Sequence, residues 1–257
     1  MKIIGDVSVE MAGHLGMVEI KRPPHNYFDK ELIGDLADAF EYLDTQDSCR
    51  VSILSAEGKS FCAGGVFAGA IDVEKRVADA KILYANAARM FKTHKPIVAA
   101  IEGAAIGGGL GVALVADFRI ACEDARFSAN FTKLGIHAGF GLSMTLPRLI
   151  GEQKANLMFY TGLRVKGVEA LEWGLVDHLV SRDRVRETAH ELATEIANCA
   201  PLAIQSMRKT IRSQMVNDII ARMDHELAEQ ARLFATRDFA EGAAAVRERR
   251  AASFIGS

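Results

Sequence analysis

The sequence predicts a mixed α/β fold in which short strands alternate with amphipathic helices around one core. Two successive segments, residues 51–91 and 97–116, repeat the same order of short apolar strand, glycine-containing loop and helix. After Asp183 no strand signal remains, and apolar residues recur only at helical spacing. We therefore expect an α/β core over residues 1–182. Residues 183–257 should form a helical region of the same domain that packs on the core or on a neighbouring subunit.

The elements of the first half follow from alternation, helical spacing and proline. Residues 7–11 and 15–20 alternate in polarity and predict a hairpin that turns around Gly13. Pro23-Pro24 ends the second strand, because proline has no N–H to give to a central ladder. Asp29 is the predicted N-cap of a helix that ends near Asp47. The repeated units then give strands over 51–54 and 97–101, and helices over 73–91 and 108–116.

The second half is predicted from the same patterns. Strand signals recur over residues 118–121, near Phe127 and over 176–180, with short helical patterns over 142–149 and 168–173. Pro201 suits the first turn of a helix, where its missing N–H has no partner to lose. Helical spacing then continues to Val246.

Composition excludes several classes of protein. The 257 residues include 31 Lys and Arg and 33 Asp and Glu, and this net charge of -2 does not favour nucleic-acid binding. No apolar run reaches the roughly 20 residues that cross a bilayer, and early acidic residues exclude a secretory signal. The four cysteines form no C-x-x-C pair, so neither zinc nor disulfides are predicted. We expect a cytoplasmic protein with reduced thiols and no metal, nucleic-acid or membrane partner.

Familiar catalytic motifs are incomplete. A P-loop ending in Lys59 would need glycine at Ile53, and a dinucleotide fingerprint starting in the glycine triplet of residues 107–109 would need glycine at Val112. The nucleophile elbow around Ser143 has Thr145 in place of its second glycine, and there is no H-E-x-x-H helix. Nucleotide hydrolysis, nicotinamide chemistry, serine hydrolysis and metalloproteolysis are therefore not predicted.

Each strand–loop–helix unit carries glycines where the chain leaves its strand: Gly64-Gly65 in the first and Gly107-Gly108-Gly109 in the second. If the two turns converge, one backbone N–H from each would form an oxyanion hole, in which each donor is worth about 3 kcal/mol. The alternative is that the glycines only allow tight packing of helix against strand.

The sequence resembles the crotonase superfamily, also called the enoyl-CoA hydratase/isomerase family. The matching blocks run in family order over nearly the whole chain. They are Phe61-Cys62-Ala63-Gly64, residues 95–109, 116–121, 125–127, 134–136, 146–151, 161–162, 169–170, 173–176 and 238–242.

This resemblance implies a spiral of β-β-α turns, a C-terminal region that assembles trimers or dimers of trimers, and an acyl-CoA thioester as substrate. Coenzyme A is then part of the substrate and no separate cofactor is expected. By position, the N–H groups of Gly65 and Gly108 would hold the thioester oxygen and stabilise an enolate. Gly65 and Val66 replace the usual Ala and Asp of the family, and the backbone donor survives both changes.

The resemblance also implies a binding site for the rest of coenzyme A. The adenine is expected beside the backbone of Gly65, Val66 and Phe67. Arg22 and the Arg249 of a neighbouring subunit are candidates for the phosphates. For both arginines the alternative is an ordinary solvated surface charge.

The sequence departs from the family where hydratases carry two glutamates. Those positions are Gly111 and Phe131. Adding water to a double bond needs one group to activate the water and one to deliver a proton, and neither residue does either. We therefore do not expect two-glutamate hydration. An apolar ring at Phe131 suits an aromatic or fatty acyl chain.

A replacement base would have to come from elsewhere. His137 follows the family block of residues 134–136 in the loop that borders the acyl pocket, and is the first candidate. Asn130 would orient water or substrate. Two functions stay open. One is a lyase or isomerase acting on CoA thioesters through an unusual base or the substrate itself, and the other is a non-catalytic acyl-CoA binding protein.

Overall fold

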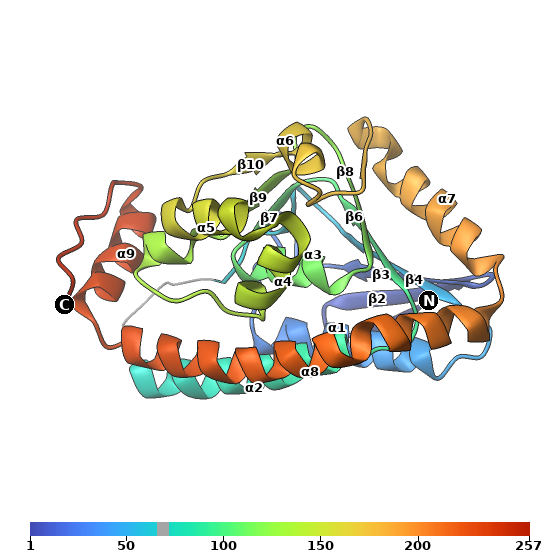
Figure 1. Ribbon diagram of the computed structural model, residues 1–257, viewed down its shortest axis with the longest axis horizontal. Coiled ribbons are helices and arrows are strands. Elements are labelled where there is room, and N and C mark those ends of the chain that lie inside the picture. The colour runs from blue at the N-terminus through green and yellow to red at the C-terminus, as the bar shows by residue number, and fades with distance from the viewer. Residues whose placement is uncertain (66–71) are drawn as a thin grey trace.

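The computed structural model describes residues 1–65 and 72–257. Within them the larger sheet has seven strands in the order β1-β2-β3-β4-β6-β8-β11 (Figure 1). These are β1 (Lys2–Ile4), β2 (Val7–Ala12), β3 (Leu15–Ile20), β4 (Val51–Ala56), β6 (Ile97–Ile101), β8 (Phe118–Ala121) and β11 (His178–Leu179). Strands β1 to β3 pair antiparallel and the remaining pairs are parallel. Gly13 turns the predicted hairpin with a φ of 62°.

A smaller sheet has the order β10-β9-β7-β5, with β5 (Ser60–Cys62), β7 (Ala104–Ile106), β9 (Arg126–Ser128) and β10 (Val165–Lys166). Strands β4, β6 and β8 of the larger sheet are each followed in the chain by one of these short strands and then by helix. The predicted β-β-α spiral is therefore confirmed. The sequence predicted a loop where β5 forms and a turn where β7 forms, because three residues are too few for a periodic pattern.

The helices follow their predicted caps closely. Helix α1 (Lys30–Asp44) begins at its N-cap Asp29, whose Oδ1 accepts from the Leu32 N–H at 2.9 Å, and it ends three residues before Asp47. Helices α2 (Val73–Phe91) and α3 (Gly108–Val115) match their predicted ranges within one residue, and every residue of α3 is buried. Beyond them lie η1 (Asn130–Leu134), α4 (Leu142–Ile150), α5 (Glu152–Thr161), α6 (Gly167–Glu172) and η2 (Arg182–Arg184).

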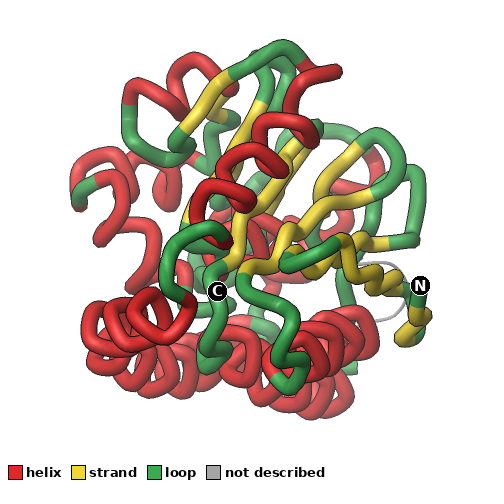
Figure 2. Tube along the Cα trace, turned by 90° about the vertical axis from the view of Figure 1, so that its right-hand side faces the viewer, coloured by secondary structure: helices red, strands yellow, loops and turns green. Residues whose placement is uncertain are grey.

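The C-terminal region consists of α7 (Val185–Ala197), α8 (Pro201–Leu233) and α9 (Arg237–Glu248). Helix α7 lies across β4, β6 and β8 (Figure 2). Helix α8 runs beside α2 along one edge of the molecule, and α9 packs on η1 (Figure 1). Pro201 is at the start of α8 as predicted. Among the described residues, no helix has the length and apolar character that crossing a membrane requires. Assembly into trimers stays a prediction.

Candidate active site

The two glycine turns are in direct contact. Strands β5 and β7 pair in parallel, so the segments that follow them leave the smaller sheet at the same edge. A Cβ placed on Gly109 would lie 2.0 Å from the Cys62 carbonyl oxygen, and one on Gly64 would lie 2.8 Å from the Ile106 carbonyl oxygen. The backbone of the opposite turn therefore leaves no room for a side chain at Gly64 or Gly109. The tight-packing explanation applies to Gly64 and Gly109 through backbone, and to Gly108 through the Phe28 ring, whose Cζ lies 2.1 Å from the Cβ position of Gly108.

Within residues 1–65 and 72–257 the fold does not use the N–H groups of Gly65 and Gly108. Phe28 donates its N–H to the Gly64 carbonyl at 3.1 Å and forms a parallel bridge with Gly65. In such a bridge the N–H of Gly65 itself points away from Phe28. Gly108 is the first residue of α3, where an N–H has no acceptor within the helix and lies at the positive end of the dipole. Neither group donates to another residue in the described part of the chain.

Both glycines line two neighbouring cavities, and Phe28 and Phe131 also belong to both. The first, of about 220 Å³, we call the aromatic cavity. The second, of about 410 Å³, extends past His25 and Tyr27 to Asn130 and Arg164. Gly65 and Gly108 therefore stand where one cavity meets the other.

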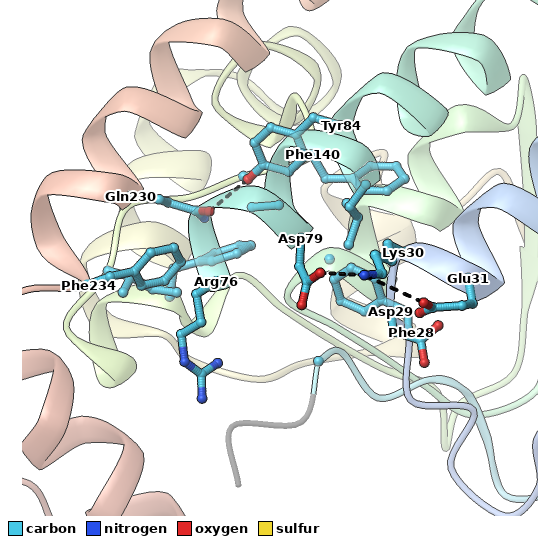
Figure 3. A pocket seen from close by; sticks show the side chains of 17 residues that line it. Phe28, Asp29, Lys30, Glu31, Arg76, Asp79, Tyr84, Phe140, Gln230 and Phe234 are labelled. Atoms are coloured by element: carbon cyan, nitrogen blue, oxygen red, sulfur yellow. Dashed lines mark hydrogen bonds and ion pairs between the residues drawn. The ribbon is translucent and has the colours of Figure 1, made fainter. Parts of the chain in front are cut away.

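The aromatic cavity has an apolar inner wall and a charged rim (Figure 3). Its aromatic side chains are Phe28, Tyr84, Phe131, Phe140 and Phe234. The Tyr84 hydroxyl donates to Gln230 Oε1 at 3.0 Å, and Gln230 Nε2 donates to the His137 carbonyl at 2.9 Å. Burial raises the pKa of Tyr84, so the phenol is neutral at physiological pH.

The rim of the aromatic cavity carries ion pairs. Lys30 Nζ contacts Asp79 Oδ1 at 2.5 Å and Glu31 Oε1 at 3.8 Å, as the dashed lines in Figure 3 mark. The rim also carries Arg76, whose guanidinium lies over the Phe239 ring at 5.5 Å from its centre. The described carboxylates of this cavity, Asp29, Glu31 and Asp79, all belong to the rim, and all three are ion-paired.

A buried carboxylate fixes the loop that forms part of the inner wall. Glu226 of α8 accepts hydrogen bonds from the Gly141 N–H at 2.7 Å, the Ser143 N–H at 2.9 Å and the Ser143 hydroxyl at 2.6 Å. Burial raises the pKa of Glu226, while these three donors oppose the shift. The loop before α4, which carries Phe140, is thereby held against α8.

The two positions of the missing glutamates have different surroundings. Phe131 lines both cavities, and its Cζ and Asn130 Oδ1 lie 3.9 and 3.4 Å from the Cβ position of Gly107. Gly111 lines neither cavity, because the Phe140 ring lies in front of it, 2.7 Å from its Cβ position. A contact between Gly111 and substrate, as its place in the family pattern implies, stays a prediction.

The predicted phosphate ligands are not gathered at the cavities. Arg22 forms ion pairs with Asp6 and with Asp29, the latter at 2.7 Å, and lines neither cavity. Arg249 ends α9 in an exposed position with a φ of 55°, also outside both. Val66 and Phe67 lie outside the described residues. Two exposed cations that the sequence does not mark as phosphate ligands, Arg126 and Arg164, do line the second cavity.

His137 is not among the residues that line the two cavities. Its Nδ1 is 2.7 Å from the Ala138 carbonyl oxygen, which can only accept, so Nδ1 bears the proton in this contact. The ring packs edge-on against His225, with centroids 5.9 Å apart. His137 lines neither cavity, and its role as a base stays a prediction.

The β-β-α spiral and the two glycine turns beside the two cavities describe an α/β protein with a candidate small-molecule site. Comparison with known proteins identifies the family to which it belongs. Residues 10–257 match the family described as enoyl-CoA hydratase/isomerase. The chain is 33% identical to the (E)-benzylidenesuccinyl-CoA hydratase of Thauera aromatica, over 98% of this chain and 99% of that protein. It is 35% identical to the carnitinyl-CoA dehydratase of Salmonella typhi, over 76% of each chain.

A solved structure agrees. An enoyl-CoA hydratase from Mycobacterium avium subsp. paratuberculosis superposes with a TM-score of 0.85 at 26% identity, over 98% of this chain and 100% of the other. The chain belongs to the enoyl-CoA hydratase/isomerase family, whose members act on acyl-CoA thioesters. The resemblance to the crotonase superfamily is thus confirmed.

Proposed function

We propose that this protein binds an acyl-CoA thioester and stabilises the enolate formed from it through the N–H groups of Gly65 and Gly108. When a base removes the α-proton, the electron pair of the C–H bond moves toward the thioester oxygen, which becomes negative. Two fixed donors aimed at that oxygen lower the barrier, because they are stronger for the developing charge than for the neutral carbonyl. The observation that carries the proposal is that both glycines line both cavities while their N–H groups have no acceptor among the described residues.

In this proposal the acyl group occupies the aromatic cavity and the coenzyme A part occupies the second. The rings around the first cavity favour an apolar or aromatic acyl group through burial and edge-to-face contacts. The named substrate of the Thauera aromatica relative, benzylidenesuccinyl-CoA, also carries an aromatic ring. Arg126 and Arg164 are better placed than Arg22 for phosphates, because they line the second cavity and Arg22 is already paired.

The reaction proposed is a lyase or isomerase step that does not use two glutamates. The inner wall of the aromatic cavity offers Tyr84 and Gln230 as its polar side chains within the described residues, and its carboxylates stand in ion pairs at the rim. This same observation favours the second candidate, an acyl-CoA binding protein without catalysis. Both candidates predict a polarised thioester carbonyl, and only the first predicts turnover of the bound acyl-CoA.

Infrared spectroscopy of a bound thioester tests the proposal independently of the base. Cinnamoyl-CoA with ¹³C at the thioester carbonyl is titrated into the protein, and binding is measured by calorimetry. We expect saturable binding and a shift of the labelled carbonyl band to lower wavenumber, because two hydrogen bonds weaken the C=O bond. An unshifted band in a saturated complex would contradict the donor pair, and absence of binding would contradict the acyl-CoA proposal itself.

Restoring the two carboxylates is expected to create hydratase activity only if Phe140 is made smaller. A side chain at Gly111 meets the Phe140 ring, so Gly111→Glu alone overpacks the core. The triple variant Gly111→Glu/Phe131→Glu/Phe140→Ala should hydrate crotonyl-CoA at least about tenfold faster than Phe140→Ala alone, since each acid–base group contributes about 10²-fold or more.

The matched control for this variant carries glutamine in place of both new glutamates. Glutamine has nearly the same shape and cannot take or give a proton at neutral pH, so its activity should stay at the level of Phe140→Ala. Equal rates for the glutamate and glutamine variants, both folded, would show that positions 111 and 131 do not face the β-carbon of the substrate.

A further inference from the structure

A third cavity lies between α2 and α8, at the end of this helix pair that is away from the aromatic cavity. The aromatic cavity is lined by the first half of α2 and by Gln230 and Phe234 near the end of α8. The third, of about 210 Å³, lies between the other ends of the same helices. It is lined by Phe91, Lys92, Thr93, His94, Gln205, Arg208, Lys209, Arg212, Ser213, Val216 and Asn217. The two helices, which lie side by side in Figure 1, therefore run antiparallel. The two cavities lie at opposite ends of the pair.

We call this third space the arginine cavity, because its inner wall contains two buried guanidinium groups. Arg208 and Arg212 are only 9% and 8% exposed. Both bind the same carboxylate: Arg208 Nε contacts Asp117 Oδ2 at 3.0 Å, and Arg212 Nη1 contacts Asp117 Oδ1 at 2.5 Å. Two buried positive charges thus share one negative charge, although buried charges are normally matched.

Each of these arginines also has a donor that the fold leaves unused. Arg208 donates Nη1 to the Thr93 carbonyl, and Arg212 donates Nη2 to the Val115 carbonyl at 3.1 Å. Arg208 Nη2 and Arg212 Nε are buried and have no partner among the described residues. Such groups are rare in folded proteins, and here the surrounding protein encloses both nitrogens almost completely.

The rest of the arginine cavity adds positive charge and no acid. Lys92 and Lys209 are exposed side chains on its rim, and neither forms an ion pair with a described residue. His94 contacts Asp44 at 3.2 Å, and the charge of Asp44 also acts on Arg208: burial lowers the pKa of Arg208, and Asp117 and Asp44 oppose that shift. The C-terminal end of α2 offsets part of this positive charge, since a helix C-terminus carries about half a negative charge. Asp44 offsets the second guanidinium, and the two rim lysines stay unbalanced.

We propose that the arginine cavity binds a compact phosphate-type oxyanion, held by Arg208 and Arg212 at its base and by Lys92 and Lys209 at its rim. An oxyanion in the cavity would compensate the positive charge of the lining, which water cannot do. Guanidinium groups are suited to such ligands, because their N–H donors match adjacent oxygens of a phosphate group. The volume of about 210 Å³ accommodates inorganic phosphate or the end of a phosphate ester. The site is independent of the acyl-CoA site and does not rest on its proposed function.

The test uses the full-length protein in phosphate-free buffer. Sodium phosphate is titrated at ionic strength held constant with sodium chloride, and binding is followed by calorimetry and by the melting temperature. We expect saturable binding of one phosphate per chain and a melting temperature that rises with phosphate beyond its value in chloride alone. Equal melting temperatures and no saturable heat would overturn the proposal.

Variants separate a built site from general charge attraction. Lys92→Ala/Lys209→Ala removes one rim cation from each side of the cavity and should weaken phosphate binding about tenfold, since each charged hydrogen bond contributes about 1 kcal/mol or more. The matched control Lys81→Ala/Arg222→Ala removes one exposed cation from α2 and one from α8, away from the cavity. It should change the affinity less than twofold. Equal losses in the two double variants would overturn the proposal.

A buried variant and two competing ligands complete the experiment. Arg212→Met leaves Asp117 paired with Arg208, so the chain should fold and bind phosphate at least about tenfold more weakly. Competition by methyl phosphate as strong as that by inorganic phosphate supports a phosphate ester as occupant, and weaker competition supports free phosphate. If sedimentation shows that Lys92→Ala/Lys209→Ala dissociates an oligomer while phosphate never binds, the occupant is a carboxylate of a second copy and the proposal is wrong.

Discussion

Replacing Gly108 with proline in the Phe28→Ala variant, which has room for the proline ring, is expected to abolish most enolate stabilisation. The variant pair is Phe28→Ala and Phe28→Ala/Gly108→Pro. The first substitution is needed because a Cβ on Gly108 would lie 2.1 Å from Phe28 Cζ. Proline then removes the N–H of residue 108 and nothing else from the hydrogen-bonding pattern, since proline is well tolerated at the first residue of a helix.

The expected effect is a loss of about 100-fold or more in the rate at which the α-protons of butyryl-CoA exchange with deuterium, which corresponds to about 3 kcal/mol. The exchange is followed by NMR, and the infrared band of a ¹³C-labelled carbonyl should return toward its value in water. Near-ultraviolet circular dichroism checks that α3 is still packed. A double variant that exchanges as fast as Phe28→Ala and keeps its shifted band would refute the role of Gly108. If Phe28→Ala itself shows no exchange, the position of the infrared carbonyl band alone tests the role of Gly108.

How far the sequence predicts this site depends on the length of its signals. The strand that becomes β6 and the helix that becomes α3 are continuous apolar runs, so they were predicted within one residue. The two glycine groups were noticed because each follows a predicted strand, and the choice of Gly65 and Gly108 within them came from the family resemblance. That the two turns lie in contact depends on the pairing of β5 with β7, whose three-residue strands have no pattern of their own.

The walls of the aromatic cavity were not predicted, because they join segments far apart in the chain. Tyr84 lies on the buried stripe of α2 with Ala87 and Met90, and the sequence alone does not distinguish a core position from a cavity position. Phe28 belongs to no periodic pattern between Pro24 and α1.

Helix α8 did contain a signal that the sequence analysis overlooked. Its buried stripe consists of Arg208, Arg212, Val216, Ile219, Met223, Glu226 and Gln230, which follow one another at steps of three or four residues. Four of these seven side chains are polar or charged. Charged residues at core positions are seldom buried without a partner, so each one predicts a distant contact. Glu226 and Gln230 shape the aromatic cavity, and the two arginines form the arginine cavity.

The largest effect on stability is expected from Asp117, the one carboxylate shared by those two arginines in the described contacts. Asp117→Ala leaves Arg208 and Arg212 buried without the carboxylate that both contact, and it removes the acceptor of the Ile97 N–H, which lies 2.9 Å from Oδ2. Breaking a buried ion pair from one side costs about 3–5 kcal/mol. We expect a loss of that size in the free energy of unfolding, measured with urea, while exposed Asp47→Ala changes it by less than about 0.5 kcal/mol.

Two further measurements attribute the loss to charge. The arginines hold the pKa of Asp117 below its ordinary value against the opposing effect of burial. A lowered carboxyl pKa adds stability that is present above the unfolded pKa of about 3.9 and disappears as the pH falls through the folded pKa, so the difference between Asp117→Ala and wild type should shrink below about pH 4. Asp117→Leu/Arg208→Met/Arg212→Met removes all the charges together and should be more stable than Asp117→Ala, because no unpaired buried charge is left. If the triple variant is the less stable of the two, packing rather than charge fixes α8 to the turn between α3 and β8.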